Sequence, residues 1–224
     1  MLLGGVSILG TYHEYNQDSF LSCCYERGYV LAVSDGLGSK DRSQIGSRAL
    51  CDSVLELAET TFDFVDPHKI LEKLHKIWLR RLSEEDIDQC GCTSLLCIIT
   101  VEEILVARLG DGFLYLDMEE GSIALFDRKV DRFVNETDCL TSNFSPWAWE
   151  YAVVPNKGFR GVIACTDGVV LNNEEEIYRD FSCDLMEEYR HCTPQNTADL
   201  ITQWLSQWPS SDDKTIGYLI QNEV

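Results

Sequence analysis

The sequence predicts an α+β fold: an αββα sandwich of two antiparallel β-sheets that face each other and are flanked by pairs of helices. Two observations lead to this prediction. Short, β-branched apolar runs come in groups, and the segments with helical spacing come in pairs rather than as single helices between strands. No repeat and no linker divides residues 1–224, so we expect one domain over the whole chain.

The first third of the chain predicts strands followed by two helices. From Ser43 the apolar residues fall at helical spacing, and Asp66-Pro67 supplies an N-cap and a first-turn proline for the second helix. Residues 26–28 predict a hairpin turn. The strands are short, apolar and bounded by Gly, Asn or Asp, and we expect them at residues 6–9, 19–25 and 29–34.

The rest of the chain returns to strands and ends with two helices and a last strand. Acidic turns separate four apolar runs in the middle of the chain, which predicts an antiparallel meander. Residues 129–149 lack a regular pattern and predict a loop or lid. The expected strands are 93–101, 104–109, 113–117, 122–126, 152–154, 161–166 and 215–221, and the expected helices are 174–189 and 193–208.

Composition excludes several classes of partner. A formal net charge of −20 argues against nucleic acid, whose phosphates need Lys and Arg. No apolar run approaches the roughly 18 residues that span a bilayer, and the N-terminus has no basic, apolar signal pattern. We therefore expect a cytoplasmic monomer with no membrane partner and with reduced cysteines. The spacing of Cys90-Gly91-Cys92 does not suit a zinc site.

Five short acidic motifs are the most informative part of the sequence. Glycine follows the aspartate in three of them, so the chain can bend tightly beside a bound ion. Several such turns, brought together from distant segments, would form an all-oxygen site for a hard divalent cation. The motifs are Asn16-Gln17-Asp18, Asp35-Gly36-Leu37-Gly38, Gly110-Asp111-Gly112, Thr166-Asp167-Gly168 and Asp212-Asp213-Lys214-Thr215.

In this order the motifs resemble those of the PPM family, the metal-dependent protein phosphatases also called PP2C. The resemblance covers residues 10–220 and looks closest to the small bacterial members. It implies a Mn²⁺- or Mg²⁺-dependent phosphatase that hydrolyses phosphoserine and phosphothreonine in proteins, with a water activated by two core ions. The implied partners are a phosphorylated protein and, as an open question, a cognate serine/threonine kinase.

The resemblance also assigns roles to individual residues. Asp35 matches the carboxylate that bridges the two core ions, and Gly36 matches a backbone carbonyl ligand. Asp167 and Asp213 match ligands that complete one ion's shell. Asp18 matches an acidic position that holds the site through waters, and its neighbour is glutamine where many members have glutamate.

Asp111 matches a position that helps to bind a third, weaker ion in several members. His13 occupies the place where the family often has an arginine that grips the substrate phosphate. Leu37 stands where many members have a histidine proposed to protonate the leaving group, and leucine cannot do so. The expected catalytic residues are therefore Asp35, Asp167 and His13.

Alternatives remain at this stage. Asp18 and Asp111 are also compatible with ordinary turn residues, and His13 with a surface histidine that has no role. A rival function is a pseudophosphatase, or partner-binding signalling module, that keeps the fold with weak or no catalysis. The changes at His13 and Leu37 favour that rival, whereas the retained aspartates favour an enzyme, because clustered carboxylates without a cation repel one another.

Overall fold

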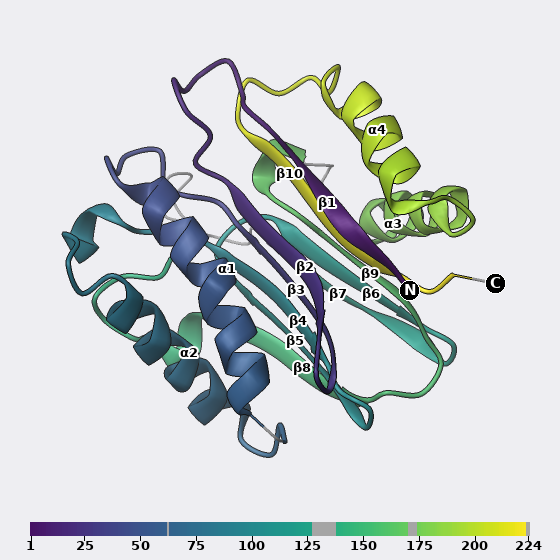
Figure 1. Cartoon of the computed structure of the whole chain (residues 1–224), viewed down its shortest axis with the longest axis horizontal. Helices are drawn as coiled ribbons and strands as arrows, with labels where there is room; N and C mark the ends of the chain where they lie inside the picture. Colours follow the sequence, from purple (N-terminus) through teal and green to yellow (C-terminus); the bar gives the residue numbers. More distant parts are fainter. Residues whose placement is uncertain (62, 127–137, 170–173, 223–224) are drawn as a thin grey trace.

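Within residues 1–61, 63–126, 138–169 and 174–222, which the computed structural model describes, two antiparallel sheets of five strands lie face to face. A pair of helices covers the outer face of each sheet (Figure 1). The α+β class and the αββα sandwich expected from the sequence are confirmed.

The order of strands in each sheet explains how distant segments meet. In one sheet the order is β1 (Leu2–Ile8), β10 (Lys214–Ile220), β9 (Phe159–Cys165), β6 (Phe113–Met118) and β7 (Gly121–Phe126). In the other it is β2 (Ser19–Tyr25), β3 (Gly28–Ser34), β4 (Ser94–Ile99), β5 (Glu103–Leu109) and β8 (Glu150–Pro155). The helices are α1 (Ser43–Thr60), α2 (Pro67–Arg81), α3 (Glu175–Tyr189) and α4 (Pro194–Leu205), and short 3₁₀ turns occupy Ile87–Gln89, Pro146–Ala148 and Asp167–Val169.

The expected meander in the middle of the chain is wrong. Strands β4 and β5 belong to one sheet, whereas β6 and β7 belong to the other, so the chain crosses between the sheets after Leu109. Gly110 and Gly112 make this crossing with φ values of +89° and +88°, in the left-handed region that favours glycine. Short apolar strands separated by acidic turns are expected in either arrangement, so the sequence pattern alone did not distinguish them.

The first strand begins earlier than expected, and its additional part contains two glycines. β1 pairs with β10 from Leu2 to Ile8, although the sequence predicted a strand only from residue 6. A Cβ atom at Gly4 would lie 2.4 Å from the Tyr218 hydroxyl, and one at Gly5 would lie 2.5 Å from the Phe20 ring. The glycines therefore leave room for large aromatic side chains, and here they do not end the strand.

Three layers of apolar side chains hold the sandwich together. β3 shows how one strand serves two of them: Leu31 and Val33 face the opposite sheet, whereas Val30 and Ala32 face α1 and α2. The third layer lies between the first sheet and α3 with α4. Because both faces of the central strands are buried, their sequences are continuously apolar.

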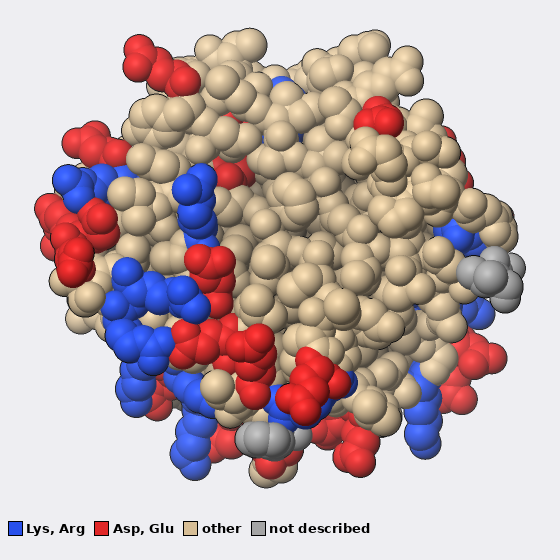
Figure 2. Space-filling model, viewed as in Figure 1, with Lys and Arg blue, Asp and Glu red and all other residues tan. Residues whose placement is uncertain are grey.

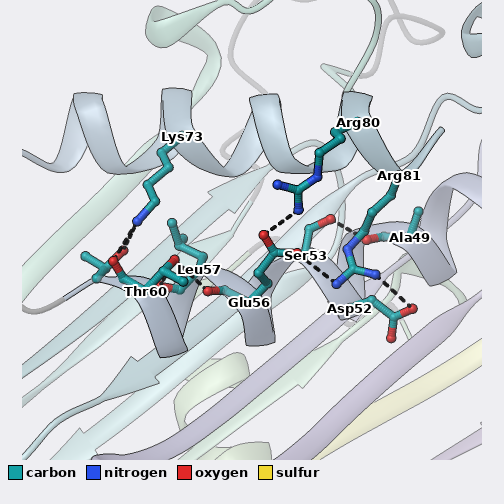
Figure 3. A network of polar contacts seen from close by, with 10 residues as sticks. Ala49, Asp52, Ser53, Glu56, Leu57, Thr60, Lys73, Arg80 and Arg81 are labelled. Carbon is teal, nitrogen blue, oxygen red and sulfur yellow. Dashed lines mark hydrogen bonds and ion pairs between the residues drawn. The ribbon is translucent and has the colours of Figure 1, made fainter. Parts of the chain in front are cut away.

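Polar contacts fix α1 against α2 at the surface. The predicted N-cap of α2 is confirmed, since the Asp66 side chain accepts a hydrogen bond from the Lys69 backbone N–H. Figure 2 shows charged side chains of both signs gathered where these helices lie. Figure 3 shows the contacts: Glu56 of α1 pairs with Arg80 and Arg81 of α2, and the Arg81–Glu56 distance is 3.0 Å. Such exposed pairs orient the helices more than they stabilise them.

The segment expected to form a loop or lid is described only in part. Residues 129–137 lie outside the described residues. Leu140 forms an isolated bridge with Cys92, and the remainder up to Trp149 is irregular apart from the turn at Pro146–Ala148. Within the described residues, no helix combines the length and the apolar character needed to cross a membrane.

We predict that Gly46→Ala in α1 destabilises the protein, although alanine is the better helix former. A Cβ atom there would lie 1.8 Å from the Cys90 carbonyl oxygen, and the Gly46 carbonyl already accepts a hydrogen bond from the Trp78 indole at 3.0 Å. Helix propensity alone would add about 1 kcal/mol of stability, whereas the displaced backbone should remove roughly 1–3 kcal/mol.

The measurement is the free energy of unfolding in urea. Arg48→Ala is the matched control, because Arg48 is exposed on the same helix, and it should change stability by no more than about 0.5 kcal/mol. A Gly46→Ala protein as stable as the parent would show that α1 can move away from residue 90.

Candidate metal centre

Four aspartates from distant parts of the chain line one polar cavity of about 230 Å³ at an end of the sandwich. Asp35 follows β3, Asp111 lies in the crossing between the sheets, Asp167 follows β9 and Asp212 precedes β10. His13, Gly36 and Leu37 also line the cavity. The structure therefore brings together five of the seven residues predicted as site residues: His13, Asp35, Gly36, Asp111 and Asp167.

Backbone hydrogen bonds hold Asp35 at the edge of the cavity. Its N–H donates to the Thr93 hydroxyl at 2.9 Å, and its carbonyl accepts from the Thr93 N–H at 2.8 Å. The next N–H, that of Gly36, donates to the Gln17 carbonyl. A Cβ atom at Gly36 would lie 2.8 Å from backbone and side-chain atoms of Ser43, so only glycine lets these three segments approach so closely.

Asp18 is buried beside this edge. Its Oδ2 accepts a hydrogen bond from the Thr166 hydroxyl at 2.8 Å, while within the described residues its Oδ1 is buried and has no hydrogen-bond partner. Burial raises the pKa of the Asp18 carboxyl to about 7, with the charge of Asp213 adding to the effect and several hydrogen bonds opposing it. A buried carboxylate oxygen without a donor is a position that a cation would satisfy.

The carboxylates also destabilise one another. Burial raises the pKa of Asp35 well above its usual range, and the negative charges of Asp18 and Asp167 raise it further, with a smaller effect from Asp212. The oxygen-only donor set and the repulsion both fit a hard divalent cation. Among the described side chains, no three His, Cys, Asp or Glu are already gathered closely enough to form a metal shell.

Asp167 is positioned by close contact between two backbone segments. The Thr166 N–H donates to the Thr215 carbonyl at 3.0 Å, and the Thr166 hydroxyl accepts from the Thr215 N–H at 3.0 Å. A Cβ atom at Gly168 would lie 1.8 Å from the Asp213 carbonyl oxygen. The glycine after Asp167 therefore permits the packing of the turn after β9 against the start of β10.

The geometry does not support the ligand role expected for Asp213. Its two carboxylate oxygens accept hydrogen bonds from the Gly10 and Gln17 backbone N–H groups, both at 2.7 Å, and its side chain is buried away from the cavity. Its neighbour Asp212 lines the cavity instead. The sequence motif contains two adjacent aspartates, and only the backbone direction at the start of β10 determines which one faces the cavity.

His13 lies at the cavity rather than on the open surface. Its Nε2 is 3.8 Å from an Asp212 carboxylate oxygen, and its side chain is only 15% exposed. The imidazole packs beside Gly38, where a Cβ atom would approach to 3.2 Å. The structure therefore places His13 on the wall of the cavity, whereas its role at the site stays a prediction. Asp212, Tyr12 and Thr93 also line the cavity, and sequence reasoning did not assign them to the site.

Comparison with known proteins gives a consistent family assignment. A family model described as Protein phosphatase 2C matches residues 11–208. No curated protein matches the sequence.

Solved structures share the fold at low sequence identity. The serine/threonine phosphatase Stp1 from Staphylococcus aureus is 15% identical, with a TM-score of 0.67 over 100% of this chain and 96% of that one. The Mycobacterium tuberculosis serine/threonine phosphatase PstP/Ppp is 14% identical, with a TM-score of 0.70 over 98% of each chain. The catalytic domain of PstP, solved with two manganese ions, matches with the same values.

We predict opposite behaviour for the two neighbouring aspartates. Asp213→Ala would leave two buried backbone N–H groups without acceptors, each worth roughly 1–3 kcal/mol, so the metal-free protein should lose at least about 2 kcal/mol of stability. Asp212→Ala should leave the metal-free stability nearly unchanged and should weaken any rise in Tm on addition of Mn²⁺, because a carboxylate that lines the cavity is lost.

Thermal unfolding of both variants, with and without Mn²⁺, makes the comparison. If Asp213→Ala is as stable as the parent and loses the rise in Tm with Mn²⁺, the metal ligand is Asp213 rather than Asp212.

Proposed function

This chain belongs to the protein phosphatase 2C family, and we propose that it is a metal-dependent phosphatase that hydrolyses phosphoserine and phosphothreonine in proteins. The observation that carries the proposal is the convergence of Asp35, Asp167 and Asp212 on one polar cavity. These residues come from three strand ends that meet only in the folded chain, and Asp18 adds a buried carboxylate beside them.

We assign two core Mn²⁺ or Mg²⁺ ions to this site. Asp35 would bridge them, the Gly36 carbonyl would complete one shell, and Asp167 with Asp212 would complete the other. Asp18 would hold the site through a water, and Asp213 would act indirectly by fixing the segments at Gly10 and Gln17. Asp111 lies on the same cavity and is assigned to a third, weaker ion.

When bound, such ions lower the pKa of a water and stabilise the oxygens of an in-line phosphoryl transfer. The chain's own contribution is to hold the carboxylates still. The Asp35 backbone is fixed by two hydrogen bonds to Thr93, and the Asp18 carboxylate by the Thr166 hydroxyl. A site held by backbone hydrogen bonds reorganises little during the reaction.

His13 is assigned to the substrate phosphate. Its imidazole is on the cavity wall near Asp212, where a protonated ring could donate a charged hydrogen bond to a phosphate oxygen. Leu37 lines the same cavity and offers no proton, so the leaving-group oxygen must receive its proton from a water or from another residue.

The second candidate function is a pseudophosphatase that uses the fold to bind partners. The apolar Leu37 on the cavity wall favours it, because an aliphatic side chain replaces a proton donor there. Both candidates imply a phosphorylated protein as a partner, and an opposing serine/threonine kinase fits the enzyme. Turnover separates them, because a pseudophosphatase would bind the ion without hydrolysis.

We predict that hydrolysis of p-nitrophenyl phosphate requires Mn²⁺ or Mg²⁺ and stops in EDTA. Asp35→Asn and Asp167→Asn should each lower the rate by at least about 100-fold, because each removes a charge that holds the ions. The folded state should persist, and the metal-free Asp35→Asn protein should be more stable, since one repelling carboxylate is gone.

The matched control is Glu84→Gln, which removes an exposed carboxylate that does not line the cavity and should leave the rate unchanged. Thermal unfolding with Mn²⁺ provides a readout besides activity. Stabilisation by Mn²⁺ without turnover would favour the pseudophosphatase, and full turnover of metal-stripped protein would exclude both assignments.

We also predict opposite effects at the two unusual positions. His13→Ala should raise KM for a phosphopeptide more than it lowers kcat at pH 6, because a contact with the ground-state phosphate is lost. Leu37→His should raise the rate on the phosphopeptide by roughly 10-fold by supplying a general acid. It should do little for p-nitrophenyl phosphate, whose leaving group departs without a proton.

The measurement is a pH–rate series on both substrates. An unchanged KM for His13→Ala at pH 6 would mean that the ions alone hold the phosphate. Equal acceleration of both substrates by Leu37→His would rule out proton donation as its cause.

A further inference from the structure

A second cavity, of about 280 Å³, lies between α3 and α4, the helix pair that covers the sheet containing β1 and β10 (Figure 1). Aromatic rings form most of the cavity wall, and two carboxylates lie beside them. The aromatic residues are Phe181, Tyr189, Trp204 and Trp208, and the carboxylates are those of Asp184 and Glu188. None of them lines the candidate metal centre.

Three of the rings meet at steep angles and form a corner. The Trp204 and Trp208 centroids are 5.7 Å apart with planes at 64°, and Phe181 lies 6.2 Å from Trp204 at 81° and 6.1 Å from Trp208 at 62°. All three side chains are partly exposed. Rings in this arrangement cannot all stack on one another, so part of their π surface faces the cavity.

The polar edge of one ring is already used inside the protein. The Trp204 indole N–H donates to the Tyr189 hydroxyl at 3.1 Å, and Tyr189 is buried. A ligand therefore meets chiefly the electron-rich face of Trp204 rather than its N–H donor. Electron-rich ring faces attract cations.

The two carboxylates make the cavity negative. Asp184 and Glu188 are exposed and one helical turn apart on α3, and within the described residues neither forms an ion pair. Burial chiefly raises the pKa of Tyr189, and the nearby Glu188 charge adds to it. The nearest cations along the helix are committed elsewhere: Arg179 pairs with Asp180, and Arg190 lines a different cavity.

We propose that this cavity binds an arginine side chain presented by a basic segment of a partner protein. Arginine suits it better than lysine because a planar guanidinium stacks on aromatic faces and can donate hydrogen bonds to two carboxylates. The volume is below the range typical of drug-sized ligands and suits a single side chain. α3 carries six acidic residues and one arginine, and this charge would attract a basic segment over a longer range.

This site is independent of the proposed phosphatase activity, so it is tested by binding alone. The full chain is titrated with acetyl-Gly-Arg-Gly-amide, and the indole N–H signals are followed by NMR. We expect two signals, those of Trp204 and Trp208, to shift. Trp78 is buried between the other sheet and its helices, so its signal should stay fixed.

Two comparisons isolate the charge. The same peptide with citrulline, which keeps the shape of arginine without its charge, should bind about tenfold more weakly. The double variant Asp184→Asn/Glu188→Gln should weaken arginine-peptide binding by a similar factor. Glu187→Gln removes a charge from the same helix outside the cavity and should change the affinity less than about twofold.

Trp208→Leu tests the ring itself, since it keeps an apolar side chain and removes a π face. It should weaken binding several-fold, with circular dichroism confirming that the fold is kept. The proposal is overturned if the citrulline peptide binds equally well, which would indicate an apolar occupant. It is also overturned if Glu187→Gln weakens binding as much as the double variant, or if neither indole signal moves at about 10 mM peptide.

Discussion

The repulsion among clustered, largely desolvated aspartates is the constraint on which the site depends. Asp18 and Asp35 both have raised pKa values, first because of burial and then because of neighbouring carboxylates. A chain gains nothing in stability from placing like charges together in a region of low dielectric. The arrangement persists because the rest of the fold imposes it, and a divalent cation would turn the repulsion into attraction.

The sandwich imposes the arrangement through strand ends and close backbone contacts. Strands β3, β9 and β10 are buried on both faces, so their direction and register cannot shift without exposing apolar side chains. Their ends therefore deliver Asp35, Asp167 and Asp212 to fixed places. Gly36 and Gly168 then let the flanking segments approach within distances that any side chain would prevent. Backbone amides at Gly10 and Gln17, bound by Asp213, add the N-terminal segment to the same framework.

Sequence reasoning succeeded where a local pattern and its physical cause coincide. The Asp66 cap, the apolar stripe of α2 and the Asp35-Gly36 turn are all encoded within a few residues, and the structure places each where the pattern predicts. It failed where the deciding contact is distant in the chain. Whether β6 pairs with β5 or with β9, and whether Asp212 or Asp213 faces the cavity, depend on strand neighbours that no local pattern specifies. The aromatic cavity was missed for the same reason, because Phe181 and Trp208 meet only when α3 and α4 pack together.

The negative charge of the protein affects what can bind at both cavities, although the cavities share no residue. With a net charge of −20, the protein attracts cations and repels a dianionic phosphate over distances comparable to the Debye length. Ions held by Asp35 and its neighbours would make the potential positive locally, where the phosphate must approach, and would leave the rest of the surface negative.

A phosphoprotein that also carries basic residues would avoid this repulsion, because its basic side chains would contact the acidic surface while its phosphate would contact the ions. The acidic rim formed by Asp184 and Glu188, backed by aromatic rings, is a place where such a basic residue gains both a charge partner and a π face. Under the proposed function, the same negative charge that would make the site dependent on cations would therefore also favour protein partners that are basic outside their phosphorylated residue.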